Sequence, residues 1–294
     1  MTQVNNTSPD STCRYQSTFN ELKEKKQKAF IPFVVIGDPT AEQSFELIKT
    51  LIDNGADALE LGIPFSDPSA DGETIQKAAL RAINAGINTN VCIDIIKKVR
   101  AYSPSTPIGL LLYGNLVFAR GIDNFYRDMK EAGVDSVLIA DVPLRESLPF
   151  RKSAAKYGIA PIFIVPPNAS EDTLKEVASF SRGYTYVLSR AGVTGVDTDK
   201  EESSKDQLSD SEQANEAVSP AQRLIEKLSL YKAAPAVLGF GISTPAQIKE
   251  ALKAGALGAI SGSAVVKVIE DNLDSPETML TEMGKFISDM KSAT

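Results

Sequence analysis

The chain has 294 residues, a formal net charge of -7, two cysteines and no histidine. Its hydrophobic fraction of 43% is enough to build a sizeable core, and no apolar run is long enough to span a membrane. The acidic balance argues against nucleic-acid binding, and two scattered cysteines are too few for a disulfide framework or a metal cluster. We therefore expect a cytoplasmic protein that binds no metal.

Residues 1–14 differ in composition from the rest of the chain, because they are rich in Ser, Thr and Asn and show no apolar stripe. A targeting peptide would carry more Arg and would avoid acids such as Asp10. We expect a disordered N-terminal arm at 1–14 and one catalytic domain at 15–294, since single α/β barrels reach this length.

From Phe30 onward, short apolar runs alternate with amphipathic stretches, which is the pattern of repeated βα units around a parallel sheet. Strands are predicted at 30–36, 58–61, 108–112, 136–140, 160–165, 184–188, 236–240 and 257–261. Helices are predicted between them, among others at 41–54, 90–101, 122–132, 170–180 and 245–254. Eight such units predict an α/β fold, a single (β/α)8 TIM barrel with its active site in the loops that follow the strands.

Two carboxyl groups near the end of the second predicted strand are the main candidates for catalysis. Glu60 shares one face of that strand with Ala58, so it should point into the barrel, and Asp71 lies in the loop that follows. A single acid at a strand end is more often solvated or paired than catalytic, but an inward acid is costly unless it is paired, hydrated or functional. Because the chain has no histidine, carboxyl groups must carry out any proton transfer near neutral pH.

The segment 196–219 interrupts the βα rhythm, because it contains eight acidic residues among Ser, Gln and Asn and has little to bury. We expect it to be a mobile acidic loop after the sixth strand. The glycines Gly192 and Gly195 favour a closing lid for the first part, and the acidic remainder is expected to be a solvated insert.

Glycine-rich turns follow the last two predicted strands, at 239–243 and 261–264. A single turn of this kind is weak evidence, but two in neighbouring units stand where barrels often bind phosphate. Glycine lets the backbone approach an anion closely, and the free N–H groups at a helix N-terminus bind it. The sequence therefore predicts a phosphate site at this end of the barrel.

Five motifs together give the chain a specific resemblance to a known family, over nearly all of residues 14–291. They are residues 33–39, 60–72, 183–195, 239–243 and 261–264. The chain resembles the tryptophan synthase alpha subunit family. The resemblance implies a carbon–carbon lyase of tryptophan biosynthesis that cleaves indole-3-glycerol phosphate to indole and glyceraldehyde 3-phosphate without a cofactor.

The resemblance also implies a role for each site residue. Glu60 would protonate indole C3 and take the proton of the glycerol hydroxyl, Asp71 would stabilise positive charge at the indole nitrogen, and Tyr186 would lie beside Glu60. Thr194 would meet Asp71 when the loop closes. The implied indole pocket is Phe33, Leu111, Leu138, Ala140, Ile164, Phe240 and Ile260, and the implied phosphate ligands are Gly195, Gly241, Gly262 and Ser263.

The family partner is a beta subunit that holds pyridoxal phosphate, so the resemblance implies an alpha-beta-beta-alpha heterotetramer and no cofactor in this chain. The implied contact surface is Pro64, Asp67, Asn115, Phe118 and Pro143. Two alternatives stay open, namely a stand-alone lyase that releases free indole and a catalytically silent activator of the beta subunit. The presence of both Glu60 and Asp71 counts against the silent activator.

Overall fold

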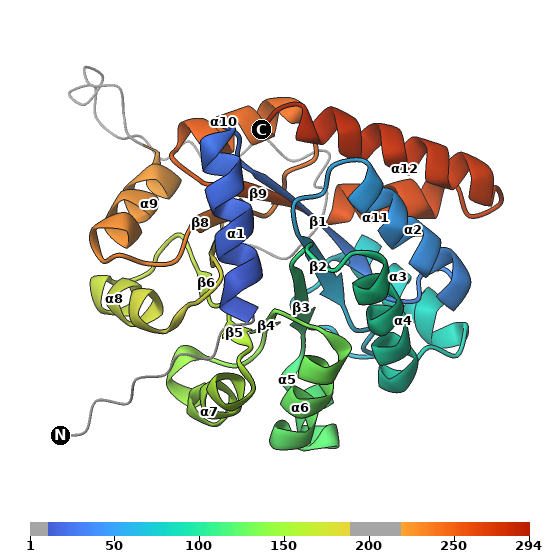
Figure 1. The fold of residues 1–294 in the computed structure, drawn as a ribbon, viewed down its shortest axis with the longest axis horizontal. Coiled ribbons are helices and arrows are strands. Elements are labelled where there is room, and N and C mark those ends of the chain that lie inside the picture. The colour runs from blue at the N-terminus through green and yellow to red at the C-terminus, as the bar shows by residue number, and fades with distance from the viewer. Residues whose placement is uncertain (1–10, 189–218) are drawn as a thin grey trace, which may run out of the picture.

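A parallel sheet forms the centre of the computed structural model, which describes residues 11–188 and 219–294 (Figure 1). In these residues the strands are β1 (Ala29–Val35), β2 (Leu59–Gly62), β3 (Ile108–Leu112), β4 (Ser136–Ile139), β5 (Ala160–Pro161), β6 (Ile164–Val165), β7 (Thr185–Leu188), β8 (Ala236–Gly239) and β9 (Gly258–Ser261). Their order is β5-β4-β3-β2-β1-β9-β8-β7-β6, and neighbours are parallel.

The two ends of this order, β5 and β6, are separated by only two residues of the chain, so the sheet must curl back on itself. The result is an α/β fold whose parallel sheet is curled into a barrel-like arrangement (Figure 1). The single strand predicted at 160–165 is wrong in this respect, since it divides into two. Ile162 N–H donates to the Val137 carbonyl of β4, whereas the Phe163 carbonyl accepts from Tyr186 of β7, so the division falls where the chain changes neighbours.

Helices surround the sheet, because each crossover between parallel strands needs one (Figure 1). In the described residues they are α1 (Ser11–Glu24), α2 (Ala41–Asp53), α3 (Glu73–Asn84), α4 (Thr89–Tyr102), α5 (Gly114–Arg120), α6 (Ile122–Ala132), α7 (Leu148–Tyr157), α8 (Glu171–Phe180), α9 (Pro220–Leu230), α10 (Pro245–Lys253), α11 (Ser263–Asp271) and α12 (Pro276–Lys291), with a 3-10 turn at Leu144–Glu146. Among these helices, none has the length and apolar character that crossing a membrane requires.

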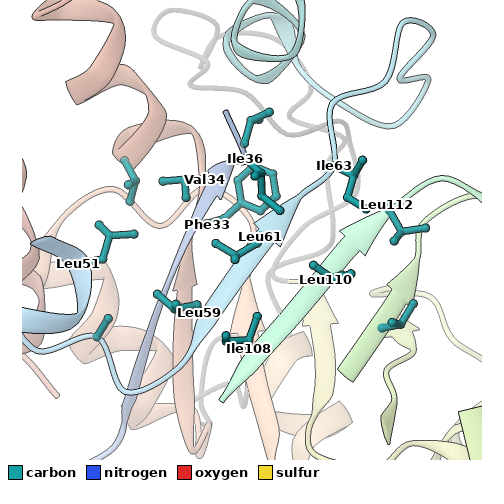
Figure 2. Packing of buried hydrophobic residues seen from close by; sticks show 14 of the residues in the cluster. Phe33, Val34, Ile36, Leu51, Leu59, Leu61, Ile63, Ile108, Leu110 and Leu112 are labelled. Carbon is teal, nitrogen blue, oxygen red and sulfur yellow. The ribbon is translucent and has the colours of Figure 1, made fainter. Parts of the chain in front are cut away.

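The core has an outer and an inner layer. In the outer layer, Val34, Leu59 and Leu61 of β1 and β2 pack against helix residues such as Leu51 of α2 (Figure 2). The inner layer fills the space inside the curled sheet and includes Ile260. Both layers follow from the strand period of two, which sends alternate side chains to opposite faces of the sheet.

Helix α1 covers the N-terminal ends of β3 and β4. Arg14 donates from Nε to the Pro104 carbonyl at 2.8 Å and from Nη1 to the Asp135 carboxylate at 2.7 Å. Residues 11–14 therefore belong to the first turn of α1, and the predicted arm is too long at this end. Residues 1–10 lie outside the described residues, as does the predicted acidic loop except for Ser219, which caps α9.

Candidate active site

Glu60 lies in β2 with its side chain inside the curled sheet, as the strand alternation predicts. The residue is only 2% exposed, and its Oε1 accepts a hydrogen bond from the Tyr184 hydroxyl at 2.7 Å. Tyr184 directly precedes β7, which is not a neighbour of β2 in the sheet. The hydrogen bond therefore crosses the interior and fixes the carboxyl group there.

Burial changes the acidity of Glu60. Removal from water raises the pKa of its carboxyl group to about 7, although the hydrogen bond from Tyr184 works in the opposite direction. A group with a pKa near neutrality is populated in both the protonated and the ionised form. Glu60 can therefore both donate and accept a proton at physiological pH.

Buried polar contacts continue from Glu60 toward α1. The rings of Tyr184 and Tyr15 have centroids 5.6 Å apart, and the Tyr15 hydroxyl shares a hydrogen bond of 2.8 Å with Ser136 Oγ. Sequence reasoning missed all three of these residues. The signal for Tyr184 was present, because it stands two residues before Tyr186 and so shares its face of the strand.

Asp71 lies in the loop between β2 and α3 and is half-buried. Burial raises the pKa of its carboxyl group to about 6, and a hydrogen bond with the Tyr113 side chain lowers it. The Tyr113 hydroxyl also accepts from Ala70 N–H at 3.1 Å, and the Tyr113 ring stacks on Phe65 at 5.3 Å. Tyr113 thus supports the whole loop, and sequence reasoning missed it because nothing in the local pattern links it to Asp71.

Tyr186 is buried near Glu60, but the hydroxyl that donates to Glu60 belongs to Tyr184. Burial and the neighbouring charge of Glu60 raise the pKa of Tyr186 well above its ordinary value. Its hydroxyl lies so close to Gly239 that any side chain at that position would collide with it. Glycine at the end of β8 therefore makes room for the Tyr186 ring.

The implied indole-pocket residues divide into groups. Phe33 and Leu111 line one hollow together with Asp71. Leu138, Ala140 and Ile164 line a second hollow. Ile260 packs in the inner core with Tyr184 and Tyr186, and Phe240 follows β8 with a φ of 82°, a strained backbone for a residue other than glycine.

The implied phosphate ligands lie at the ends of β8 and β9. Gly241 has a φ of 76°, which favours glycine, and Gly262 is the N-cap of α11, with Ser263 as the first helical residue. The first N–H groups of a helix have no acceptor within the helix, so the N-terminus of α11 is suited to bind an anion. Gly195 and Thr194 lie outside the described residues.

Comparison with known proteins identifies the family. The family model for the tryptophan synthase alpha chain matches residues 19–294. The chain is 56% identical to the tryptophan synthase alpha chain of Photobacterium profundum over 281 residues, which cover 96% of this chain and 98% of that protein. It is 54% identical to the alpha chain of Citrobacter koseri, with the same coverage of both chains.

Solved structures agree with the sequence relatives. The tryptophan synthase subunit alpha of Legionella pneumophila superposes with a TM-score of 0.81 at 28% identity and covers 95% of this chain and 97% of its own. A chain of the tryptophan synthase complex of Pyrococcus furiosus superposes with a TM-score of 0.73 at 29% identity, covering 89% and 97%. The chain belongs to the tryptophan synthase alpha chain family.

Proposed function

We propose that Glu60 and Asp71 together perform the reaction of this family in the present chain. As a family member the chain is a lyase of tryptophan biosynthesis that cleaves indole-3-glycerol phosphate, and the pyridoxal phosphate belongs to the beta subunit. The observation that carries the proposal is the buried, tyrosine-bonded carboxyl group of Glu60, with a pKa near neutrality.

Cleavage requires two proton transfers around one carbon–carbon bond. Glu60 donates its proton to indole C3, which makes the indole ring a leaving group. The resulting carboxylate then takes the proton of the adjacent glycerol hydroxyl, the bond between C3 and the glycerol carbon breaks, and its electron pair returns to the ring while the aldehyde forms. The pKa of about 7 suits both directions of transfer.

Asp71 has the complementary task. Protonation at C3 leaves positive charge on the indole nitrogen, and a fixed carboxylate beside it stabilises that charge. With a pKa raised only to about 6, Asp71 is mainly ionised at neutral pH. The two acids thus occupy environments that separate their roles, with the more buried Glu60 as the proton carrier.

The remaining residues are assigned to the parts of the substrate that they would contact. Tyr186 lies beside Glu60 at the reacting carbon. The N–H groups of Gly241, Gly262 and Ser263 bind the phosphate together with Gly195, and Thr194 contacts Asp71 when the loop after β7 closes. The two hollows supply apolar walls for indole, with Phe33 on the Asp71 side.

The finer architecture is also part of the proposal. We take residues 15–294 as one closed barrel of eight βα units, with β5 and β6 forming one divided strand, and residues 196–219 as a loop inserted after the sixth unit. The parallel order of the described strands and the two-residue link between β5 and β6 support this description.

The partner of the chain is proposed to be a cytoplasmic beta subunit, in an alpha-beta-beta-alpha assembly. Phe118 of α5 is 59% exposed although its ring contacts that of Phe150 edge to face, with centroids 5.3 Å apart, so more than half of this large apolar side chain is available for contact. The match to a chain of the Pyrococcus furiosus tryptophan synthase complex supports the formation of a complex. The other proposed contact residues are Pro64, Asp67, Asn115 and Pro143.

One assay tests these statements. The purified chain is incubated with indole-3-glycerol phosphate alone and with a beta subunit, and indole and glyceraldehyde 3-phosphate are both measured. We expect slow cleavage alone and a large increase with the beta subunit. Full activity without stimulation would indicate a stand-alone lyase, and no cleavage in either case, with activation of the beta subunit retained, would indicate a silent activator.

A further inference from the structure

An ion pair with a buried carboxylate holds α3, the helix that begins two residues after Asp71. The Asp38 carboxylate lies in the loop after β1 with a fully buried side chain, and it accepts from Arg81 Nε at 2.8 Å and from Arg81 Nη2 at 2.9 Å. Arg81 stands in the last turn of α3. Two parallel bonds from one guanidinium fix the orientation of the helix as well as its distance from β1.

The turn that carries Asp38 is itself fixed. Gly37 N–H donates to Ser44 Oγ of α2 at 2.8 Å, and Gly37 has a φ of 87° that favours glycine. The side chain of Ile87, three residues beyond the end of α3, packs directly against Gly37, so that an added Cβ would overlap it. The same turn therefore contacts the last turn of α3 through Arg81 and the segment that follows the helix through Ile87.

The opposite end of α3 determines the place of Asp71. Gln76 Nε2 donates to the Asp71 carbonyl at 2.7 Å, which ties the first turn of the helix directly to Asp71 in the preceding loop. Ile75 and Ala79 of α3 line the same hollow as Asp71. A shift of the helix would therefore move both the carboxylate and one wall of the hollow.

We infer that Asp38 and Arg81 are positioning residues for Asp71, because their ion pair fixes α3 against the end of β1 and so places the Asp71 carboxylate at the indole end of the substrate. This inference rests on the proposed role of Asp71. The pair acts through the helix and not by touching the substrate, so its loss should slow the chemical step while the phosphate end still binds.

The test compares the replacement of a basic residue by Gln at two positions of α3. Arg81→Gln removes the guanidinium that pairs with Asp38, and Lys77→Gln, one turn earlier, removes ion pairs with the exposed Glu73 and the half-buried Glu270. We expect Arg81→Gln to lower kcat for indole-3-glycerol phosphate by about tenfold or more, because small misplacements of a catalytic group cost rate steeply. The Kd for glycerol phosphate should change less than about twofold, and Lys77→Gln should leave both values near those of the unmodified chain.

Two further variants separate positioning from general loss of structure. Arg81→Lys keeps the charge but not the two paired hydrogen bonds, so it should give an intermediate kcat. Asp38→Asn should lower kcat as much as Arg81→Gln does. Circular dichroism at the assay temperature checks that each variant is folded. The inference is overturned if every folded variant of the pair keeps the kcat of Lys77→Gln, or if glycerol phosphate binding falls as much as kcat. An unchanged kcat in Asp71→Asn would instead overturn the proposed function.

Discussion

Burial controls the acidity of both carboxyl groups in the candidate active site. Glu60 is almost completely enclosed and has a pKa of about 7, whereas the half-buried Asp71 reaches about 6. Each is also restrained by a tyrosine, Tyr184 for Glu60 and Tyr113 for Asp71. The difference in burial therefore supports different tasks for two chemically similar groups.

The exchange of Glu60 for its amide tests its proton transfer. Glu60→Gln preserves the shape of the side chain and removes only its ability to carry a proton, so we expect kcat to fall by about 10²- to 10⁴-fold while the fold stays intact. Steady-state cleavage of indole-3-glycerol phosphate measures the loss, with circular dichroism as the control. Near-normal turnover would remove Glu60 from the mechanism.

The same exchange should change how stability depends on pH. Because the pKa of Glu60 is raised from 4.5 to about 7 in the folded chain, folding favours its protonated form. Stability from this group is therefore present below pH 4.5 and is lost as pH rises through about 7.

Glu60→Gln has no proton to lose, so it should escape this loss. Its free energy of unfolding relative to the unmodified chain should rise by about 2 to 3 kcal/mol between pH 5 and pH 8, from the linkage of roughly 1.4 kcal/mol per pKa unit and because part of the change is already complete at pH 5. Urea unfolding at both pH values measures the difference. A difference that does not change with pH would contradict the raised pKa.

Sequence alternation predicted the inward direction of Glu60, but it could not select its hydrogen-bond donor. Tyr184 and Tyr186 stand on the same face of one strand, and which hydroxyl reaches Glu60 depends on distances across the sheet interior. Tyr113 is a similar case, since its contact with Ala70 joins residues 43 positions apart. Such contacts depend on how strands pack and not on any local pattern.

At the level of elements, the charged cluster under α1 links the helix to the sheet. The Asp135 side chain is fully buried and accepts from Arg14, from Arg100 and from Ile108 N–H, with distances of 2.7, 2.7 and 2.8 Å. All of its partners would lose an acceptor together if the carboxylate were removed. The cluster therefore joins α1, α4 and β3 at one point.

We expect Asp135→Ala to lower the free energy of unfolding by about 3 to 5 kcal/mol, because it leaves two partly buried guanidinium groups and a buried backbone N–H without their shared acceptor. Asp123→Ala is the matched control, since Asp123 forms an exposed ion pair with Lys156. Urea unfolding at pH 7 compares the two variants. Equal, small losses would show that the cluster under α1 adds little to stability.

Element boundaries were predictable where one apolar run pairs with the same neighbours throughout. The strand predicted at 108–112 is the observed β3, and the helix predicted at 122–132 is the observed α6. The prediction of one strand at 160–165 failed because the run changes its neighbouring strand in the middle, and the local composition does not show this change. The predicted arm took in the first turn of α1, and the helix itself was not among the helices predicted, because its anchors, Pro104 and Asp135, are far away in the sequence.

The acidic segment gives a prediction at the same scale. Replacement of residues 200–217 by a short Gly/Ser linker should leave the melting temperature nearly unchanged, because the segment has few apolar side chains to bury and closure entropy depends only weakly on loop length. Differential scanning calorimetry of the two chains measures this. A drop of many degrees would show that the segment packs against the rest of the protein.

At the level of the whole molecule, the chain must bind a phosphate dianion although its own net charge is -7. Its overall field repels such a ligand, so local backbone N–H groups must provide the attraction. The N-terminus of α11 is the proposed place. A side chain at Gly262 can begin without a clash, because the φ of -110° is negative and an added Cβ would lie 3.8 Å from Phe33.

Gly262→Asp should therefore keep the fold and place a negative charge at the anion site. We expect the Kd for glycerol phosphate to rise by about tenfold or more, since like charges at close range repel strongly, while indole binding changes much less. Gly262→Asn, with the same shape and no charge, is the control. Its affinity for glycerol phosphate should fall only by the amount that the added bulk causes. Equal losses for both ligands would mean that the site as a whole is disturbed, and no loss for either would place the phosphate elsewhere. Because the two variants differ only in charge, their comparison separates local electrostatics from packing in an otherwise acidic molecule.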